Sequence, residues 1–300
     1  VKGALCSRLY PLKDYRISAD DDIHIPEGEF LTCHEQLLAA GLTTETAPDE
    51  LSSADEVSYT KKDSPLYIEL HRHLFDSSED AHDDLNRFFA DFQPVEIDGF
   101  LAMPPHEHLL YLILHAYKHF VNCGIGLRQF CDIGLWAREY HDAINWQKLH
   151  DQCASVHAAT FASAAFRIAT EYLGIAIELP SSWHTSIDVE PMLHDTLCGG
   201  VYGSNDYTRL HSSTITLNAV KSSRKGGKST ILRTVFPKKV YLESRYPYLK
   251  KHPYLLPVAW AQRIIHYAEE KQGSADNSAS GSIKLAKERI ALMKQYDIMD

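Results

Sequence analysis

The hydrophobic periodicity of the chain changes once along its length, and this change constrains the fold more than any other feature. Residues 20–25 end in alternating polar and apolar side chains, and residues 65–71 alternate with a period of two, which is typical of half-buried strands. From Pro104 onward the apolar residues follow helical spacing. We therefore predict an α+β fold, with a mixed β-sheet domain over residues 1–102 and a mainly α-helical domain over residues 103–300.

Capping and stop signals predict individual helices. Thr32 and Glu35 form a capping box, and Gly41 supplies a C-terminal stop, so a helix is expected between them. Asn145 is an N-cap residue for another helix. Further helices are expected over residues 80–92, 105–121, 126–140, 158–173 and 283–296, and flexible segments near 204–229 and 272–282.

The composition is that of a folded protein. Hydrophobic residues make up 44% of the 300 residues, which is enough to bury a core and excludes a mainly disordered chain. The longest strictly apolar run, residues 109–114, is far shorter than the roughly 20 residues of a membrane-spanning helix, so no membrane partner is expected. The six cysteines are scattered without a Cys-x-x-Cys pair, which favours reduced thiols and a cytoplasmic location.

The charge of the chain is unevenly distributed. Residues 1–100 hold 8 Lys and Arg against 22 Asp and Glu, a net charge of −14, within a total of −10. Such an acidic region repels phosphates unless metal ions intervene, and it suits a site that holds cations. Residues 221–251 are basic instead, with ten Lys and Arg against one acid. We interpret this segment as a solvated basic face, which leaves nucleic acid as a less favoured partner there.

Two carboxylates on the first predicted strand are the strongest candidates for chemistry. Asp20 and Asp22 are two residues apart, so on a strand they share a face at about 6.5–7 Å. On the second predicted strand, Ile68 and Leu70, with Leu66, would face the core, and Glu69 would face the other way. If the strands pair, Glu69 becomes a third acid, and such a triad suits Mg²⁺ or Mn²⁺. Solvent-exposed acids are the alternative interpretation.

The order of motifs carries a resemblance to a known family. Lys2-Gly3, Tyr10, Arg16, Asp20-x-Asp22 and Glu69-x-His71 occur in sequence, and they resemble the uncharacterised nucleotidyltransferase family of the DNA polymerase β-like nucleotidyltransferase superfamily. In the helical half, His115-x-x-x-His119 followed by Asp132, and residues 236–260, are also similar to this family. The chain departs from the wider superfamily at two points: Lys2-Gly3 replaces a Gly-Gly or Gly-Ser turn, and the third acid is Glu.

This resemblance implies a nucleotidyltransferase-like sheet domain and a magnesium-dependent enzyme. The enzyme would transfer a nucleoside monophosphate from a nucleoside triphosphate (NTP) to a hydroxyl of a small-molecule, peptide, protein or RNA acceptor. Asp20, Asp22 and Glu69 would hold the metal, and Glu69 would deprotonate the acceptor. The nucleotide-binding residues would be Lys2, Gly3, Arg16 and His71.

Residues in the helical half are candidates for binding the acceptor. His115 and His119 lie one helical turn apart, a spacing that can bind a metal, although a hydrogen-bonding role is favoured. Lys118, Arg128 and Asp132 complete the acceptor-side set.

Other functions are less favoured by the sequence. Residues 226–229 look like the end of a phosphate-binding loop, but Ser222 replaces its first glycine. No Gly-x-Ser-x-Gly motif supports a covalent hydrolase. The main alternative to an enzyme is a catalytically silent nucleotide-sensing or partner-binding module, such as an antitoxin-like regulator.

Overall fold

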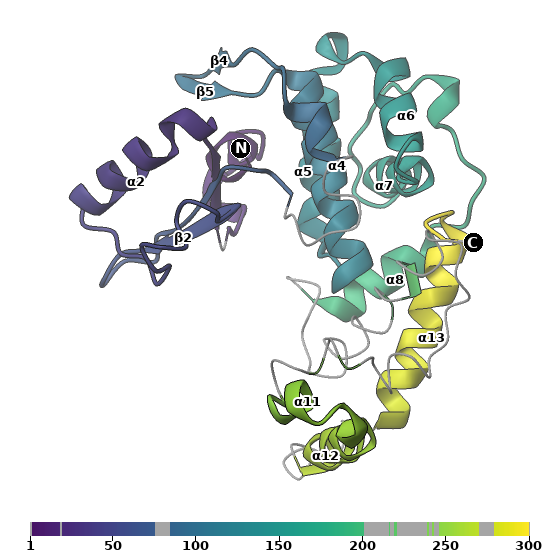
Figure 1. Ribbon diagram of the computed structural model, residues 1–300. Coiled ribbons are helices and arrows are strands. Elements are labelled where there is room, and N and C mark those ends of the chain that lie inside the picture. Colours follow the sequence, from purple (N-terminus) through teal and green to yellow (C-terminus); the bar gives the residue numbers. More distant parts are fainter. Residues whose placement is uncertain are drawn as a thin grey trace. The chain divides into compact units, whose positions relative to one another are not determined.

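The computed structural model describes residues 2–18, 20–75, 85–200, 216, 219–220, 239, 242, 246–269 and 279–299 (Figure 1). The chain forms two compact units, one made of Val1–His115 with Arg128–Ser186, the other of Ala116–Leu127 with Ile187–Asp300. Strands lie in the first unit together with helices, and the described part of the second unit is helical. The α+β prediction is confirmed, and the predicted division between residues 102 and 103 stays a prediction.

A mixed three-stranded sheet forms the centre of the N-terminal part. Its strands are β1 (Asp21–His24), β2 (Glu56–Thr60) and β3 (Tyr67–His71), in the order β1-β3-β2. Strand β1 is parallel to β3, and β2 is antiparallel to β3. The two strands expected from alternation are therefore confirmed. Leu66 was expected to face the core, but it precedes β3 and is exposed.

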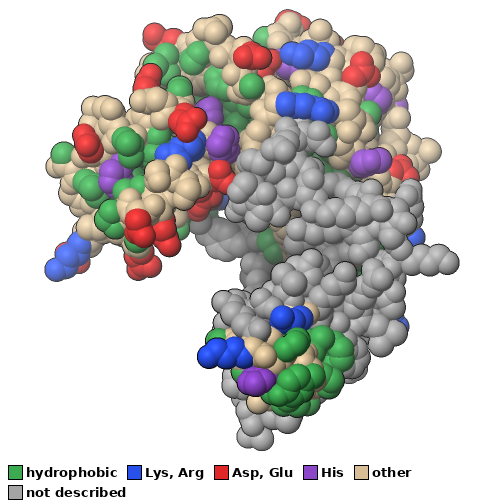
Figure 2. Space-filling model, viewed as in Figure 1, with side chains coloured by type: hydrophobic (Ala, Val, Ile, Leu, Met, Phe, Trp, Pro, Cys, Tyr) green, Lys and Arg blue, Asp and Glu red, His purple; other side chains and the backbone are tan. Residues whose placement is uncertain are grey.

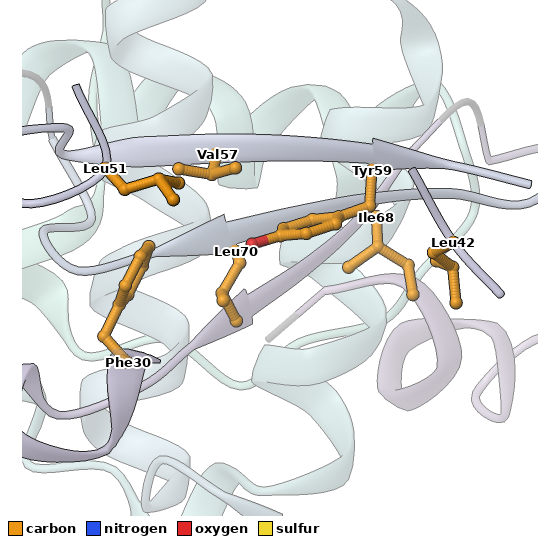
Figure 3. Close-up of a cluster of buried hydrophobic side chains, with 7 residues drawn as sticks. All are labelled: Phe30, Leu42, Leu51, Val57, Tyr59, Ile68 and Leu70. Atoms are coloured by element: carbon orange, nitrogen blue, oxygen red, sulfur yellow. The ribbon is translucent and has the colours of Figure 1, made fainter. Parts of the chain in front are cut away.

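One face of this sheet is covered by apolar side chains (Figure 3). The helix α2 (Phe30–Ala39) contributes Phe30, which is fully buried, and packs Cys33 and Leu37 against the same cluster. Because side chains alternate along a strand, the opposite face of the sheet carries the polar residues. The seven buried members of the cluster are Phe30, Leu42, Leu51, Val57, Tyr59, Ile68 and Leu70.

The start of α2 differs from the prediction, whereas its end does not. The helix begins at Phe30, with Glu29 at the N-cap and no side-chain cap, so the expected capping box at Thr32 is wrong. Burial of Phe30 against the sheet extends the helix past that local signal. Gly41 follows the helix with φ +82°, a left-handed conformation that glycine adopts without strain.

The short helix α1 (Gly3–Ser7) packs closely against β1. A Cβ atom on Gly3 would lie 1.8 Å from Asp21 Oδ1, so a larger residue there would require the Asp21 carboxylate to move aside. The contact fixes the first residues of the chain beside the strand that carries Asp22. Short 3-10 turns follow at Lys13–Tyr15 and Glu27–Glu29.

A second, two-stranded sheet was not predicted. Strands β4 (Val95–Ile97) and β5 (Phe100–Ala102) pair antiparallel around Asp98-Gly99, which have φ 52° and 84°. An Asp-Gly turn is a strong hairpin signal, but three-residue strands are too short to show alternation. The helix expected over 80–92 lies partly outside the described residues, and Arg87–Phe89 forms a 3-10 turn.

The helices expected between residues 105 and 173 are confirmed. They are α4 (Pro105–Asn122), α5 (Leu127–Glu139), α6 (Trp146–Ala154) and α7 (Ala159–Glu171). Asn145 caps α6 as predicted, since its side chain accepts a hydrogen bond from the Lys148 N–H at 2.9 Å. A 3-10 turn at His141–Ala143 precedes α6, and another lies at Ser181–Trp183.

The second unit contains α8 (Glu190–Gly199), α11 (Tyr248–Lys251), a 3-10 turn (Pro253–Leu255), α12 (Leu256–Glu269) and α13 (Ala279–Gln295). The last helix is confirmed, but it begins at Ala279, so residues 279–282 are helical rather than part of a flexible segment. Residues 272–278, the possible phosphate loop at 226–229 and nearly all of 204–229 lie outside the described residues. Among the described helices, none has the length and apolar character needed to cross a membrane.

Candidate active site

The polar face of the three-stranded sheet brings the predicted carboxylates together. Asp22 on β1 and Glu69 on β3 are directly paired across the parallel strands, and Asp20 immediately precedes β1. The Asp22 side chain is fully buried, whereas those of Asp20 and Glu69 are each 21% exposed. In the space-filling view, acidic, histidine and basic side chains lie together over this N-terminal part (Figure 2).

Lys2 reaches both aspartates from the start of α1. Its Nζ lies 2.9 Å from Asp22 Oδ2 and 3.2 Å from Asp20 Oδ2. A third contact, of 3.0 Å, joins Nζ to His115 Nε2 on α4. Burial lowers the pKa of Lys2, but the charges of Asp22 and Asp20 outweigh it and raise that pKa above its ordinary value. Lys2 is therefore a cation held between two acids.

His71 occupies the other side of Asp22. Its Nε2 lies 3.1 Å from Asp22 Oδ1 and 3.8 Å from Glu69 Oε2, while Nδ1 lies 3.7 Å from Glu56 Oε2. Burial lowers the pKa of His71, but hydrogen bonds to Asp22 and Glu69 outweigh this and raise it to about 9. For Asp22, burial raises the pKa, yet the His71 hydrogen bond and the Lys2 charge hold it well below its usual range.

The donor atoms in this cluster fit a divalent cation. Asp22, Glu69 and His71 each offer one ligand atom, and these atoms lie within 4.8 Å of one another. In addition, Asp20 Oδ1 is buried and has no hydrogen-bond partner among the described residues. Carboxylate oxygens suit Mg²⁺ and Mn²⁺, and ligation by His71 requires its neutral imidazole. Sequence reasoning placed His71 with the nucleotide; its alternation with Glu69 could have indicated a ligand.

Arg16 and Asp132, expected at different parts of the site, contact each other. The Arg16 guanidinium donates from Nε to Asp132 Oδ1 at 2.9 Å and from Nη2 to Oδ2 at 2.8 Å. The Tyr10 hydroxyl donates to the same Oδ1 at 2.8 Å. Arg16 Nη1 also donates to Ser18 Oγ at 3.3 Å, and that hydroxyl donates to the Asp20 carbonyl at 2.8 Å. The network thus runs from the buried Arg16–Asp132 pair to an exposed hydrogen bond at Ser18, in the segment that presents Asp20.

Two of the acceptor-side candidates have contacts to the segments that carry Lys2 and Asp20. His115 contacts Lys2 as described, and Arg128 donates to the Ile17 carbonyl, in the segment that leads to Asp20. Lys118 and His119 continue along α4, but they belong to the second unit.

Two further residues of the polar region were missed by sequence reasoning. The Tyr111 hydroxyl lies 3.4 Å from His115 Nδ1, and burial together with the charges of Asp22 and Asp20 raises the pKa of Tyr111 well above its ordinary value. Its position one helical turn before His115 was the available signal. His24 shares the face of Asp22, and burial lowers the pKa of His24 to about 4.

A comparison with protein families identifies the family of this chain. The model of the family described as uncharacterised nucleotidyltransferase matches residues 1–174, more than half of the 300 residues. The chain therefore belongs to this family, which confirms the resemblance stated above for the motifs within residues 1–174, whereas the resemblance of residues 236–260 stays a prediction. No curated protein and no solved structure matches the chain significantly. Membership supports nucleotidyl transfer as the general activity and an NTP as substrate.

Proposed function

We propose that the protein transfers a nucleoside monophosphate from an NTP to a hydroxyl group of an acceptor, at the polar face of the β1-β3-β2 sheet. The observation that carries the proposal is the pairing of Asp22 with Glu69 across two parallel strands, with Asp20 beside them. An acidic cluster of this kind would bind an NTP only through an intervening cation, and the family match independently supports an NTP substrate.

Asp22 and Glu69, with Asp20 or His71, would hold a Mg²⁺ or Mn²⁺ ion. When bound, such an ion neutralises phosphate charge and favours ionisation of an attacking oxygen. Asp22 would serve as the fixed ligand, since it is fully buried and held by Lys2 and His71. We assign the positioning of Asp20 to Arg16, whose guanidinium is held by Asp132, in place of the direct phosphate contact expected from the sequence.

Glu69 is the candidate general base. It is more exposed than Asp22, and its Oε2 lies 3.8 Å from His71 Nε2. In the transfer, Glu69 accepts the proton of the acceptor hydroxyl, and that oxygen forms a bond to the α-phosphorus. The bond from the α-phosphorus to the bridging oxygen breaks, and pyrophosphate leaves with its electron pair.

Thermal unfolding with each of ATP, GTP, CTP and UTP, with and without Mg²⁺, tests the proposal. A ligand at about 100 times its Kd stabilises by about 2.7 kcal/mol, so binding gives a clear rise in Tm. We expect a magnesium-dependent rise for at least one nucleotide, lost in Asp22→Asn. The Asp14→Asn variant removes an equal charge from an exposed position and should behave as the wild type.

Pyrophosphate release in the presence of candidate acceptors completes the test. Release that depends on an acceptor and is lost in Asp22→Asn supports the enzyme. A nucleotide-dependent rise in Tm without release from any hydroxyl acceptor would favour the silent nucleotide-sensing module. The absence of any rise with all four nucleotides contradicts the proposed site.

A further inference from the structure

The two oxygens of Asp22 face two different cationic groups. Oδ2 lies 2.9 Å from Lys2 Nζ, which also lies 3.2 Å from Asp20 Oδ2. Oδ1 lies 3.1 Å from His71 Nε2, which in turn is 3.8 Å from Glu69 Oε2. Asp22 therefore separates two positions where a cation is favoured. One lies between Asp20 and Asp22, and the other lies beside Glu69.

The Lys2 ammonium fills the first of these positions. Its side chain is only 7% exposed, and it contacts one oxygen of each aspartate. A Mg²⁺ ion binds oxygen at about 2.0–2.1 Å, in the same space between the two carboxylates. An ammonium and a divalent ion cannot occupy that space together, because both steric overlap and charge repulsion oppose it.

The placement of Lys2 allows its ammonium to leave without disturbing the fold. Lys2 is the N-cap residue of α1, and the helix packs against β1. The flexible four-carbon side chain can rotate while the backbone stays in place. Phosphate oxygens are strong acceptors for a lysine ammonium, so the triphosphate offers Lys2 an alternative partner.

We propose that Lys2 is a resident cation of the Asp20–Asp22 position, which a divalent ion enters only after the triphosphate of a nucleotide has drawn the ammonium away. The inference rests on the proposed function and extends it to the order of binding. Without nucleotide, one ion binds beside Asp22 and Glu69. With nucleotide, Lys2 contacts phosphate and a second ion binds between Asp20 and Asp22.

The number of bound Mn²⁺ ions tests this order. Electron paramagnetic resonance of free Mn²⁺ counts the ions bound by the full chain, with no dependence on turnover. At the same Mn²⁺ concentration we expect one bound ion for the wild type without nucleotide and two for Lys2→Met. Lys148→Met, which removes a lysine paired with Glu107 far along the sequence, is the matched control and should bind one ion.

A second neutral variant and a measurement on the wild type keep the proposal testable if Lys2→Met does not fold. Lys2→Gln keeps a polar group between the aspartates and is also expected to bind the second ion. If neither variant folds, the wild type with a non-hydrolysable NTP analogue should bind two ions where the wild type alone binds one, and the second ion should bind at a lower Mn²⁺ concentration than the analogue alone requires.

The possible failures separate the two proposals. Equal ion numbers and affinities for the wild type and the Lys2 variants overturn the role of Lys2, as do two ions in the nucleotide-free wild type, and both results leave the proposed function standing. If neither the wild type nor Lys2→Met binds Mn²⁺, the metal site itself is refuted, and the proposed function fails with it.

Discussion

Replacing Asp132 by alanine tests whether this carboxylate stabilises the N-terminal segment or serves to bind an acceptor. In the structure its oxygens accept two hydrogen bonds from Arg16 and one from Tyr10. The side chains of Arg16 and Asp132 are only 1% and 6% exposed. An acceptor-binding role predicts little effect on unfolding, whereas the observed contacts predict a large one.

The size of the expected loss of stability follows from the groups that Asp132→Ala leaves without a partner. The Arg16 guanidinium would remain buried with its main anionic partner removed, and the Tyr10 hydroxyl would lose its acceptor. Removing one partner of a buried ion pair costs about 3–5 kcal/mol, because the remaining charge stays desolvated. We therefore expect the free energy of unfolding to fall by about 3–5 kcal/mol, a large fraction of the stability of an ordinary domain.

Urea unfolding followed by circular dichroism measures this change. The double variant Arg16→Met with Asp132→Leu removes both charges and should recover much of the loss, because no unpaired ion remains buried. Asp142→Ala is the control, since its carboxylate is exposed and pairs with a surface histidine. A fall below about 1 kcal/mol for Asp132→Ala, or a double variant as unstable as the single one, would refute the reasoning.

Three other predictions follow from the packing of the N-terminal part and from the cysteines. Gly3→Ala should lower the free energy of unfolding by about 0.5–1.5 kcal/mol, because its Cβ would force the Asp21 carboxylate out of its present rotamer, and adding Asp21→Ala should restore most of it in the same urea assay. Leu70→Ala should cost about 2–5 kcal/mol, since Leu70 is fully buried in the sheet core; a loss below about 1 kcal/mol in urea would contradict that packing. At pH 8 a colorimetric thiol reagent should label the exposed Cys198 quickly and Cys153 only after unfolding, because burial raises the pKa of Cys153 to about 12; rapid labelling of Cys153, mapped by mass spectrometry, would disprove its burial.

Local sequence signals were sufficient for much of the fold. Alternation predicted β1 and β3, and helical spacing predicted α4 to α7, including the cap at Asn145. These signals succeed because each element must bury one of its own faces, and that requirement is written in nearby residues. The β4–β5 hairpin was not predicted, because its strands are too short to show an alternating pattern. The start of α2 was misplaced because Phe30 is buried by the sheet, which a local cap signal does not report.

The candidate site, like the fold, could be predicted only in part from the sequence. The sequence by itself predicted that Asp20 and Asp22 lie close together, since side chains two residues apart on a strand point the same way. In the structure Asp20 lies just before β1 rather than on it, and both carboxylates contact Lys2 Nζ. Glu69 was expected beside them on the condition that the two strands pair, and the parallel register of β1 and β3 meets that condition.

Only the tertiary structure decided which partners those groups have. It placed Lys2 between Asp20 and Asp22, and it joined Arg16 to Asp132 across 116 residues of chain. These contacts cannot be predicted from the spacing of residues in the sequence, because ion pairs between distant residues depend on how α1, β1 and α5 pack together. The physical reason is that periodicity records which face an element buries, whereas the partner of a buried charge is set by the element that packs against it.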